Sequence, residues 1–375
     1  MTSKERMMRA LSREKPDRLP VTVHQWQQYH LDNHMGGVDP LTAFEMTGMD
    51  AALQYFEAMG QFWFPNAEQH LTQTRQWRDE VEVVSAAPEN KVLHHTITTP
   101  EGTLTYKTAG NLTTTWITEY LVKHREDIEL LAKYMPVPEV DKARVASEYD
   151  ALGDAGILRG FVWGDQAGCW QHACCLVHVQ HLILEAYDNP DWVHRLLTIL
   201  LDKKMRFIEE SLVGCKFDLI ETGGGASSDT VISPELHRQF CLPYDRALHR
   251  ALHDAGFRVT YHTCGGMTHI LDLIVENESD ASETLSPPGV GGNITDPAAV
   301  RERFAGKVAM IGGMDQFNVL TKGTPAQMRA EVHRLFEGFG SEGGYILSTA
   351  DHFFDAPVEN LRAYAAAARE CTYSG

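Results

Sequence analysis

The chain has 375 residues, of which 43% are hydrophobic and 22% are charged, an ordinary balance for a globular protein with a sizeable core. Its formal net charge of −18 repels phosphate backbones and argues against nucleic acid as a partner. No apolar run is long enough to cross a bilayer, and the charged stretch MTSKERMMRALSREKPDR lacks the apolar segment of a signal peptide. The seven cysteines, an odd number, predict free thiols and a cytoplasmic location.

In chain order, the pattern predicts a helix over residues 3–12, a strand over Leu19–Val23 and a weaker strand near residues 50–55. Residues 76–119 differ, because short Thr- and Val-rich runs separated by turn residues are typical of a β-meander. Further strands begin near residues 158, 217, 258, 280, 307 and 344. Helices are expected between and after them, over residues 189–212, 233–256 (kinked at Pro243), 266–276, 297–304, 324–338 and 357–370.

This alternation of strands and helices indicates a parallel sheet in an α/β protein. Counting eight strand–helix units favours a closed (β/α)8 barrel, of the TIM type, as one domain over residues 1–375. The β-meander at 76–119 would then be an insertion in that domain. An open, doubly wound sheet is the alternative, because the second strand is weak.

Polar side chains follow the predicted strands, at the end of a barrel where catalysis takes place. They are His24, Trp26, Asp165, Gln166, Glu221, His262, Cys264, Glu283, Asp315, Asp351 and His352. We take Glu221 and Asp315 as candidate catalytic residues, and His24, Trp26, Asp165 and Gln166 as candidates for contacting substrate. The simpler alternative is that Asp165 and Asp315 cap helices. Aromatic residues near the same ends would suit a flat, apolar ligand.

The stretch VTYHTCGGMTH, residues 259–269, contains the most specific pattern. Where a strand breaks into a loop, His262 and Cys264 point to the same side, and zinc favours this mixture of nitrogen and sulfur ligands. Glu283, on the next strand, is placed to supply a third ligand. The alternative is a Cys–His nucleophilic pair, which we disfavour because strand neighbours two apart are expected to splay. Packing residues are the third interpretation.

Taken together, RALSREKPDRLPV, ISPELHRQFCLPYDRALHRALHDAG, YHTCGG, GGMDQ, LTKGTPAQM, GGYILS and APVENLRAYAAAA resemble the uroporphyrinogen decarboxylase superfamily. The resemblance implies a (β/α)8 barrel and one of two chemistries. True decarboxylases carry an arginine-rich segment after the first strand, whereas this chain has HQWQQYHLDNH, without arginine. The other branch, to which HTCGG is similar, contains zinc-dependent methyltransferases that work with corrinoid proteins.

The resemblance implies His262, Cys264 and Glu283 as zinc ligands, as in the more distant cobalamin-independent methionine synthases. Thiol-methylating relatives add a late cysteine, where this chain has Asp351 and His352 in ILSTADHFF. The fourth ligand is therefore Asp351, His352 or water. A carboxylate, imidazole or water makes zinc a harder Lewis acid than a thiolate does, which suits an oxygen or nitrogen in a methyl donor.

We therefore expect methyl transfer from a methoxylated aromatic or methylamine-type donor to cob(I)alamin, with zinc as the bound metal. We expect the corrinoid to arrive on a partner protein. The relatives also make a homodimer an expectation. The alternatives are a methylcorrinoid:thiol methyltransferase, a metal-independent decarboxylase-like lyase that uses Asp165 or Asp315 as its acid, and a non-catalytic binding protein.

Overall fold

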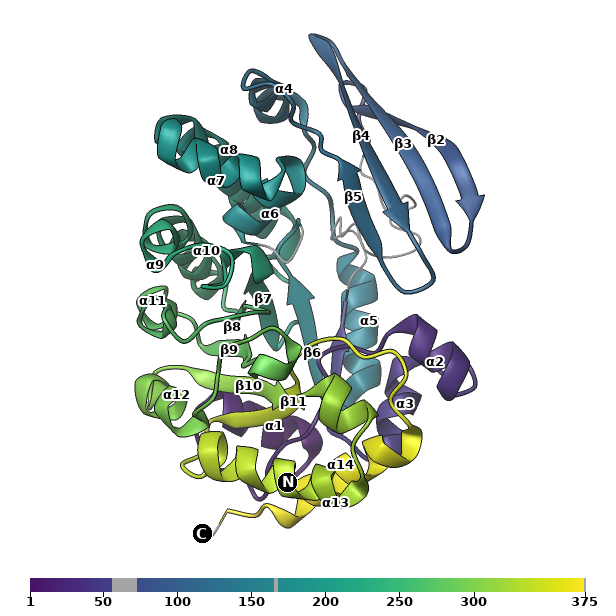
Figure 1. Ribbon diagram of the computed structural model, residues 1–375, viewed down its shortest axis with the longest axis vertical. Helices are drawn as coiled ribbons and strands as arrows, with labels where there is room; N and C mark the ends of the chain where they lie inside the picture. The colour runs from purple at the N-terminus through teal and green to yellow at the C-terminus, as the bar shows by residue number, and fades with distance from the viewer. Residues whose placement is uncertain (56–72, 165–167, 374–375) are drawn as a thin grey trace.

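A seven-stranded parallel sheet forms the centre of the protein, seen in a computed structural model that describes residues 1–55, 73–164 and 168–373 (Figure 1). Its strand order is β1-β6-β7-β8-β9-β10-β11. The strands are β1 (Ala51–Gln54), β6 (Gly156–Phe161), β7 (Leu219–Gly223), β8 (Val259–His262), β9 (Ala281–Thr284), β10 (Ala309–Met314) and β11 (Tyr345–Thr349). Neighbours in sequence are neighbours in the sheet, so the order never reverses as it must in a doubly wound sheet.

The segment 19–23 closes the sheet between its two outer strands. Val21 forms a parallel bridge with Leu347 of β11, and the backbone N–H of Leu347 donates to Pro20 at 2.9 Å. On the other side, the N–H of Asp50 donates to the carbonyl of Val21 at 2.7 Å, directly before β1. The predicted barrel is thereby confirmed. The first strand is reduced to a bridge where Pro20, which has no N–H, interrupts the ladder.

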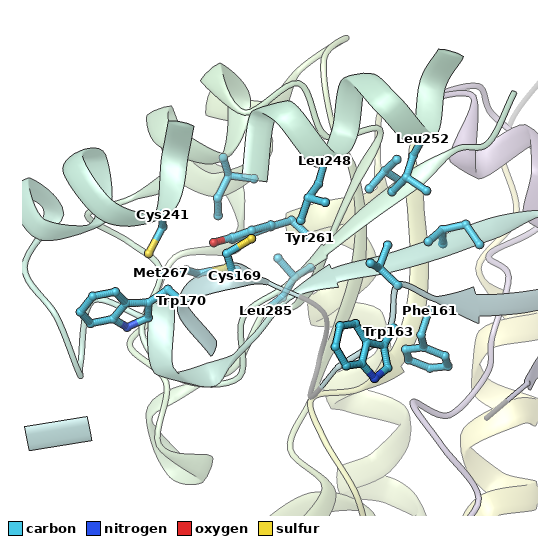
Figure 2. Packing of buried hydrophobic residues seen from close by; sticks show 14 of the residues in the cluster. Phe161, Trp163, Cys169, Trp170, Cys241, Leu248, Leu252, Tyr261, Met267 and Leu285 are labelled. Carbon is cyan, nitrogen blue, oxygen red and sulfur yellow. The ribbon is translucent and has the colours of Figure 1, made fainter. Parts of the chain in front are cut away.

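Helices surround the strands, as Figure 1 shows for α8, α10, α11 and α12. They are α1 (Ser3–Leu11), α2 (Gln28–His34), α3 (Pro40–Thr47), α4 (Asp127–Tyr134), α5 (Lys142–Leu152), α6 (Cys169–Leu176), α7 (Val179–Asp188), α8 (Pro190–Phe207), α9 (Pro234–Leu236), α10 (Leu242–Asp254), α11 (Leu271–Glu276), α12 (Pro297–Phe304), α13 (Pro325–Leu335) and α14 (Val358–Glu370). Leu248 and Leu252 of α10 pack with Tyr261 of β8 in the apolar layer between helix and barrel wall (Figure 2).

Two helices differ from the prediction in where they begin or divide. The helix predicted over 233–256 is divided before Pro243, where a π-helical turn at His237–Cys241 precedes α10. The helix predicted over 266–276 begins only at Leu271. There, the side-chain oxygen of Asn293 accepts from the N–H groups of Met267 and Thr268, at 3.0 and 3.1 Å, and holds this stretch as a turn.

The predicted meander is an antiparallel sheet of β2 (Arg78–Ala87), β3 (Asn90–Thr99), β4 (Gly102–Gly110) and β5 (Thr115–Glu119), paired in that order. Figure 1 shows it standing apart from the barrel strands. Alternate side chains of β3 and β4 are buried, as expected when one face of a sheet is covered. The meander is confirmed; its standing as an insertion within one domain stays a prediction.

Helix α1 covers one end of the barrel. Its residues Met7, Ala10 and Leu11 form a buried cluster with residues from the starting halves of the strands, such as Ile157 and Leu219. The N-terminal end of the barrel is therefore filled with apolar side chains. The opposite end, where the strands stop, is left for polar residues.

Candidate functional site

Strand register places two glutamates and one histidine together on the inner face of the barrel. His262 on β8 is level with Glu283 on β9, and Glu221 on β7 is level with Thr260, two residues before His262. Side chains two residues apart on a strand point to the same face. Glu221, His262 and Glu283 are all nearly completely buried.

An arginine from the neighbouring strand joins the two carboxylates. Nη2 of Arg159 on β6 donates to Oε2 of Glu221 at 2.8 Å and to Oε1 of Glu283 at 2.6 Å. Nδ1 of His262 lies 3.3 Å from Oε1 of Glu283 and 3.5 Å from Oε1 of Glu221. The result is a buried network in which each acidic side chain faces both the guanidinium and the imidazole, and such pairing is what these side chains need in order to be buried.

His24, which directly follows the closing segment 19–23, completes a group of three possible metal ligands. Its Nδ1 lies 3.9 Å from Oε2 of Glu283, and its ring centre lies 5.1 Å from that of His262. One ligand atom from each of His24, His262 and Glu283 lies within 4.8 Å of the others. Oε2 of Glu283 is buried without a hydrogen-bond partner. Two imidazoles and a carboxylate with a free oxygen fit zinc.

The loop after β11 supplies a second group around His24. One ligand atom each from His24, Asp351 and His352 also lies within 4.8 Å of the others. Asp351 and His352 are partly exposed, and Nε2 of His352 lies 2.8 Å from Oε1 of Gln25. The two residues that replace the late cysteine therefore lie beside the buried group, as the resemblance implies.

Burial and neighbouring charges set the protonation of the network. Burial and the adjacent Glu283 raise the pKa of Glu221 to about 8. Burial opposes ionisation of Glu283 as well, but the Arg159 guanidinium and His262 hold its pKa well below the usual range. Burial lowers the pKa of His24 to about 3, so this imidazole is neutral, the form that binds metal ions. One carboxylate is thus ionised beside one that holds its proton near neutral pH.

Cys264 contacts His262, although it belongs to neither three-residue group. Burial opposes protonation of His262, but Glu221 and a side-chain hydrogen bond with Cys264 help to raise its pKa well above the usual range. The expectation that these two side chains splay apart is therefore wrong. On the other side, a Cβ at Gly225 would lie 2.6 Å from the sulfur, so Cys264 packs closely against this loop. Its role as a zinc ligand stays a prediction.

Asp315, one of the two predicted catalytic residues, has a structural role. Both carboxylate oxygens of Asp315 are used at the start of the turn Gln316–Thr321, one by the N–H groups of Phe317 and Asn318 and one by the Asn318 amide. This geometry supports the capping alternative and not the predicted catalytic role.

Trp26 lies in the core, with rings of Phe44 and Phe353 packed edge-on at 5.5 and 5.6 Å. Because 7% of this residue is exposed, the predicted substrate contact is not supported. Asp165 and Gln166 lie outside the described residues.

Sequence reasoning missed Arg159 and gave His24 a different role. Arg159 stands in the middle of the strand segment ILRGF, where every residue is buried. An arginine within a short buried strand needs a buried acidic partner. This requirement could have marked Arg159 as a site residue from the sequence. His24 was taken for a substrate contact because the sequence alone does not show which strand-end side chains lie next to one another inside the barrel.

The fold and site define a (β/α)8 barrel protein with a buried acid–imidazole cluster at its C-terminal mouth. The family model for uroporphyrinogen decarboxylase (URO-D) matches residues 113–371, and the chain belongs to this family. The resemblance stated from the sequence is thereby confirmed. Among the described residues, no helix is long and apolar enough to cross a membrane.

The relatives include both decarboxylases and methyltransferases. A uroporphyrinogen decarboxylase of Ectopseudomonas mendocina is 29% identical over 198 residues, 48% of this chain and 51% of that protein. A methylated-thiol–coenzyme M methyltransferase of Methanosarcina mazei is 25% identical over 146 residues, 39% of this chain and 36% of that protein. The chain thus spans about half the length of the curated decarboxylases it matches, or less.

A solved methyltransferase structure from Methanosarcina mazei shares the fold. It matches with a TM-score of 0.64 over 99% of both chains, at 16% sequence identity.

Proposed function

We propose that the protein is a zinc-dependent methyltransferase that takes a methyl group from a small donor and passes it to the cob(I)alamin of a separate corrinoid protein. The observation that carries this proposal is the group of His24, His262 and Glu283, with its free, buried carboxylate oxygen. The names and similarity of the Methanosarcina mazei methyltransferases support the reaction class.

The ligand atoms indicate the type of donor. His24, His262 and Glu283 would hold the ion, with Asp351 or His352 beside it, so that hard nitrogen and oxygen ligands predominate. Zinc in such a site supplies a Lewis acid that polarises an oxygen or nitrogen of the donor. We therefore propose a methoxylated aromatic or methylamine-type compound as the methyl donor, and not a thiol as the acceptor.

The protein's own residues prepare the site for this chemistry. Arg159 keeps Glu283 ionised, and burial keeps His24 neutral, so both are in the state that binds a cation. Apolar packing by α1 closes the far end of the barrel, so substrate and partner must share the C-terminal mouth. The proposal also includes a cytoplasmic location, because none of the seven cysteines forms a disulfide.

One observation favours a metal-independent lyase as the second candidate. Arg159 already satisfies the charge of Glu283 without a metal ion, and a family model named for a decarboxylase matches most of the chain. This alternative predicts activity on a carboxylated substrate that survives removal of metal.

The test is an anaerobic assay in which cob(I)alamin is converted to methylcobalamin, followed by its visible spectrum. Methoxylated aromatics and methylamines are offered as donors, with and without a chelator. We expect conversion with at least one donor and its loss on chelation. In parallel, methylcobalamin is offered with a thiol. Thiol methylation without any donor demethylation would overturn the proposed direction, and chelator-resistant release of carbon dioxide from a carboxylated substrate would favour the lyase.

A further inference from the structure

Arg159 donates hydrogen bonds to both carboxylates of the cluster through a single nitrogen, Nη2. It lies in the middle of β6, and 2% of it is exposed. Burying an arginine is unfavourable unless its charge is paired. Its position among acidic side chains at the base of the mouth therefore calls for a functional explanation.

The contacts of Arg159 divide the two oxygens of Glu283 between different tasks. Oε1 accepts from Arg159 at 2.6 Å and lies 3.3 Å from Nδ1 of His262. Oε2 is buried, has no hydrogen-bond partner and lies on the side of His24, 3.9 Å from its Nδ1. One oxygen is thus occupied by cationic donors while the other is left for a ligand.

Arg159 also occupies Glu221. Oε2 of Glu221 accepts from the same nitrogen at 2.8 Å, and its Oε1 lies 3.5 Å from Nδ1 of His262. Glu221 is therefore close enough to compete for a cation near His262. The hydrogen bond with Arg159 gives this carboxylate a partner within the barrel, in place of a metal ion.

We propose that Arg159 is a positioning residue that presents only Oε2 of Glu283 to the metal ion and keeps Glu221 out of the ligand set. The inference rests on the proposed function, since it concerns the same metal site. Beyond that function, Arg159 would set the coordination number of the ion without touching it. A guanidinium is suited to this task because it is always charged and holds its donors in a rigid plane.

The experiment uses Co²⁺ in place of zinc, because the visible absorption of Co²⁺ reports coordination number without any need for activity. Four-coordinate Co²⁺ absorbs strongly, and higher coordination absorbs weakly. Wild type, Arg159→Gln, Arg159→Lys and the double variant Arg159→Gln/Glu221→Gln are titrated. Arg6→Gln is the matched control, because Arg6 is a buried arginine held by Asp17 and Asp50 outside the cluster.

We expect Arg159→Gln to lower the visible absorptivity of bound Co²⁺ by at least about two-fold, because Glu221 loses its partner and joins the ion. The double variant should recover the wild-type spectrum, because the competing carboxylate is gone. Arg6→Gln should leave the spectrum unchanged even if it unfolds more easily. Should Arg159→Gln not fold, Arg159→Lys provides the comparison, with an intermediate spectrum expected.

Identical spectra for wild type and both Arg159 variants would overturn the role of Arg159 while leaving the metal site intact. A reduced absorptivity that Glu221→Gln does not restore would overturn the claim about Glu221. Failure of the wild type to bind Co²⁺ would overturn the proposed function itself, and the inference with it.

Discussion

Nδ1 of His24 lies 3.9 Å from Oε2 of Glu283, although one residue follows the first strand position of the barrel and the other lies within β9. The segment 19–23 pairs with β11, so His24 is brought to the rim next to the last strand and faces inward. A histidine that looks isolated in sequence thereby becomes part of a three-residue group with His262 and Glu283.

The first prediction concerns which side chains hold zinc. His24→Ala should weaken zinc affinity by at least about 100-fold, because it removes an atom of the ligand group. Cys264→Ser should weaken it less than about 10-fold, because the sulfur contacts His262 and is outside both groups. Isothermal titration with a competing chelator measures both affinities, and the reverse order would restore the His-x-Cys site expected from the sequence.

The second prediction concerns Asp315. Asp315→Ala removes the acceptor for the N–H groups of Phe317 and Asn318 and should lower the free energy of unfolding by about 1 kcal/mol. Zinc affinity and methyl transfer should stay within about two-fold of the wild type, because this carboxylate caps a helical turn. Urea denaturation and the cob(I)alamin assay report the two properties, and a loss of activity in a stable variant would reinstate Asp315 as a catalytic residue.

The third prediction concerns pH and stability. Burial lowers the pKa values of His30 and His237 to about 4, and that of His249 to about 3, from an ordinary value of 6.5. These imidazoles are neutral in the folded protein and take up protons more readily when it unfolds. Their contribution to stability is complete above pH 6.5 and is lost as the pH falls towards 4.

Urea denaturation of the wild type and of His249→Gln at about pH 7.5 and about pH 5.5 checks this third prediction. The variant lacks one of the titrating imidazoles, so it should lose less free energy of unfolding on acidification than the wild type does. Glu221, whose raised pKa has the opposite effect on stability, is present in both proteins and cancels in this comparison. An equal change in both proteins would show that His249 does not couple protonation to folding.

The sequence predicts the barrel and the meander because both depend on local patterns. Apolar strands alternating with amphipathic helices, and Thr-rich runs separated by turns, are visible within short windows. The inward direction of His262 and Glu283 also follows from strand periodicity. The partnership of His24 with Glu283, and that of Arg159 with two carboxylates, depends on how distant strands meet, which no window contains. The burial of Trp26 was missed for the same reason, since it depends on neighbours that are distant in sequence. The cap at Asp315 is a contact with Phe317 and Asn318, so the sequence could offer it as an alternative.

The most direct test of the metal site is the metal content of the purified protein and of its Glu283→Gln variant. Both are loaded with zinc, passed through a desalting column and measured by inductively coupled plasma mass spectrometry. The account predicts about one zinc ion per wild-type chain and less than about a tenth of that in the variant, because the substitution removes the buried carboxylate and its free Oε2 atom. Equal trace amounts of zinc in both proteins would contradict the metal site and with it the proposed function.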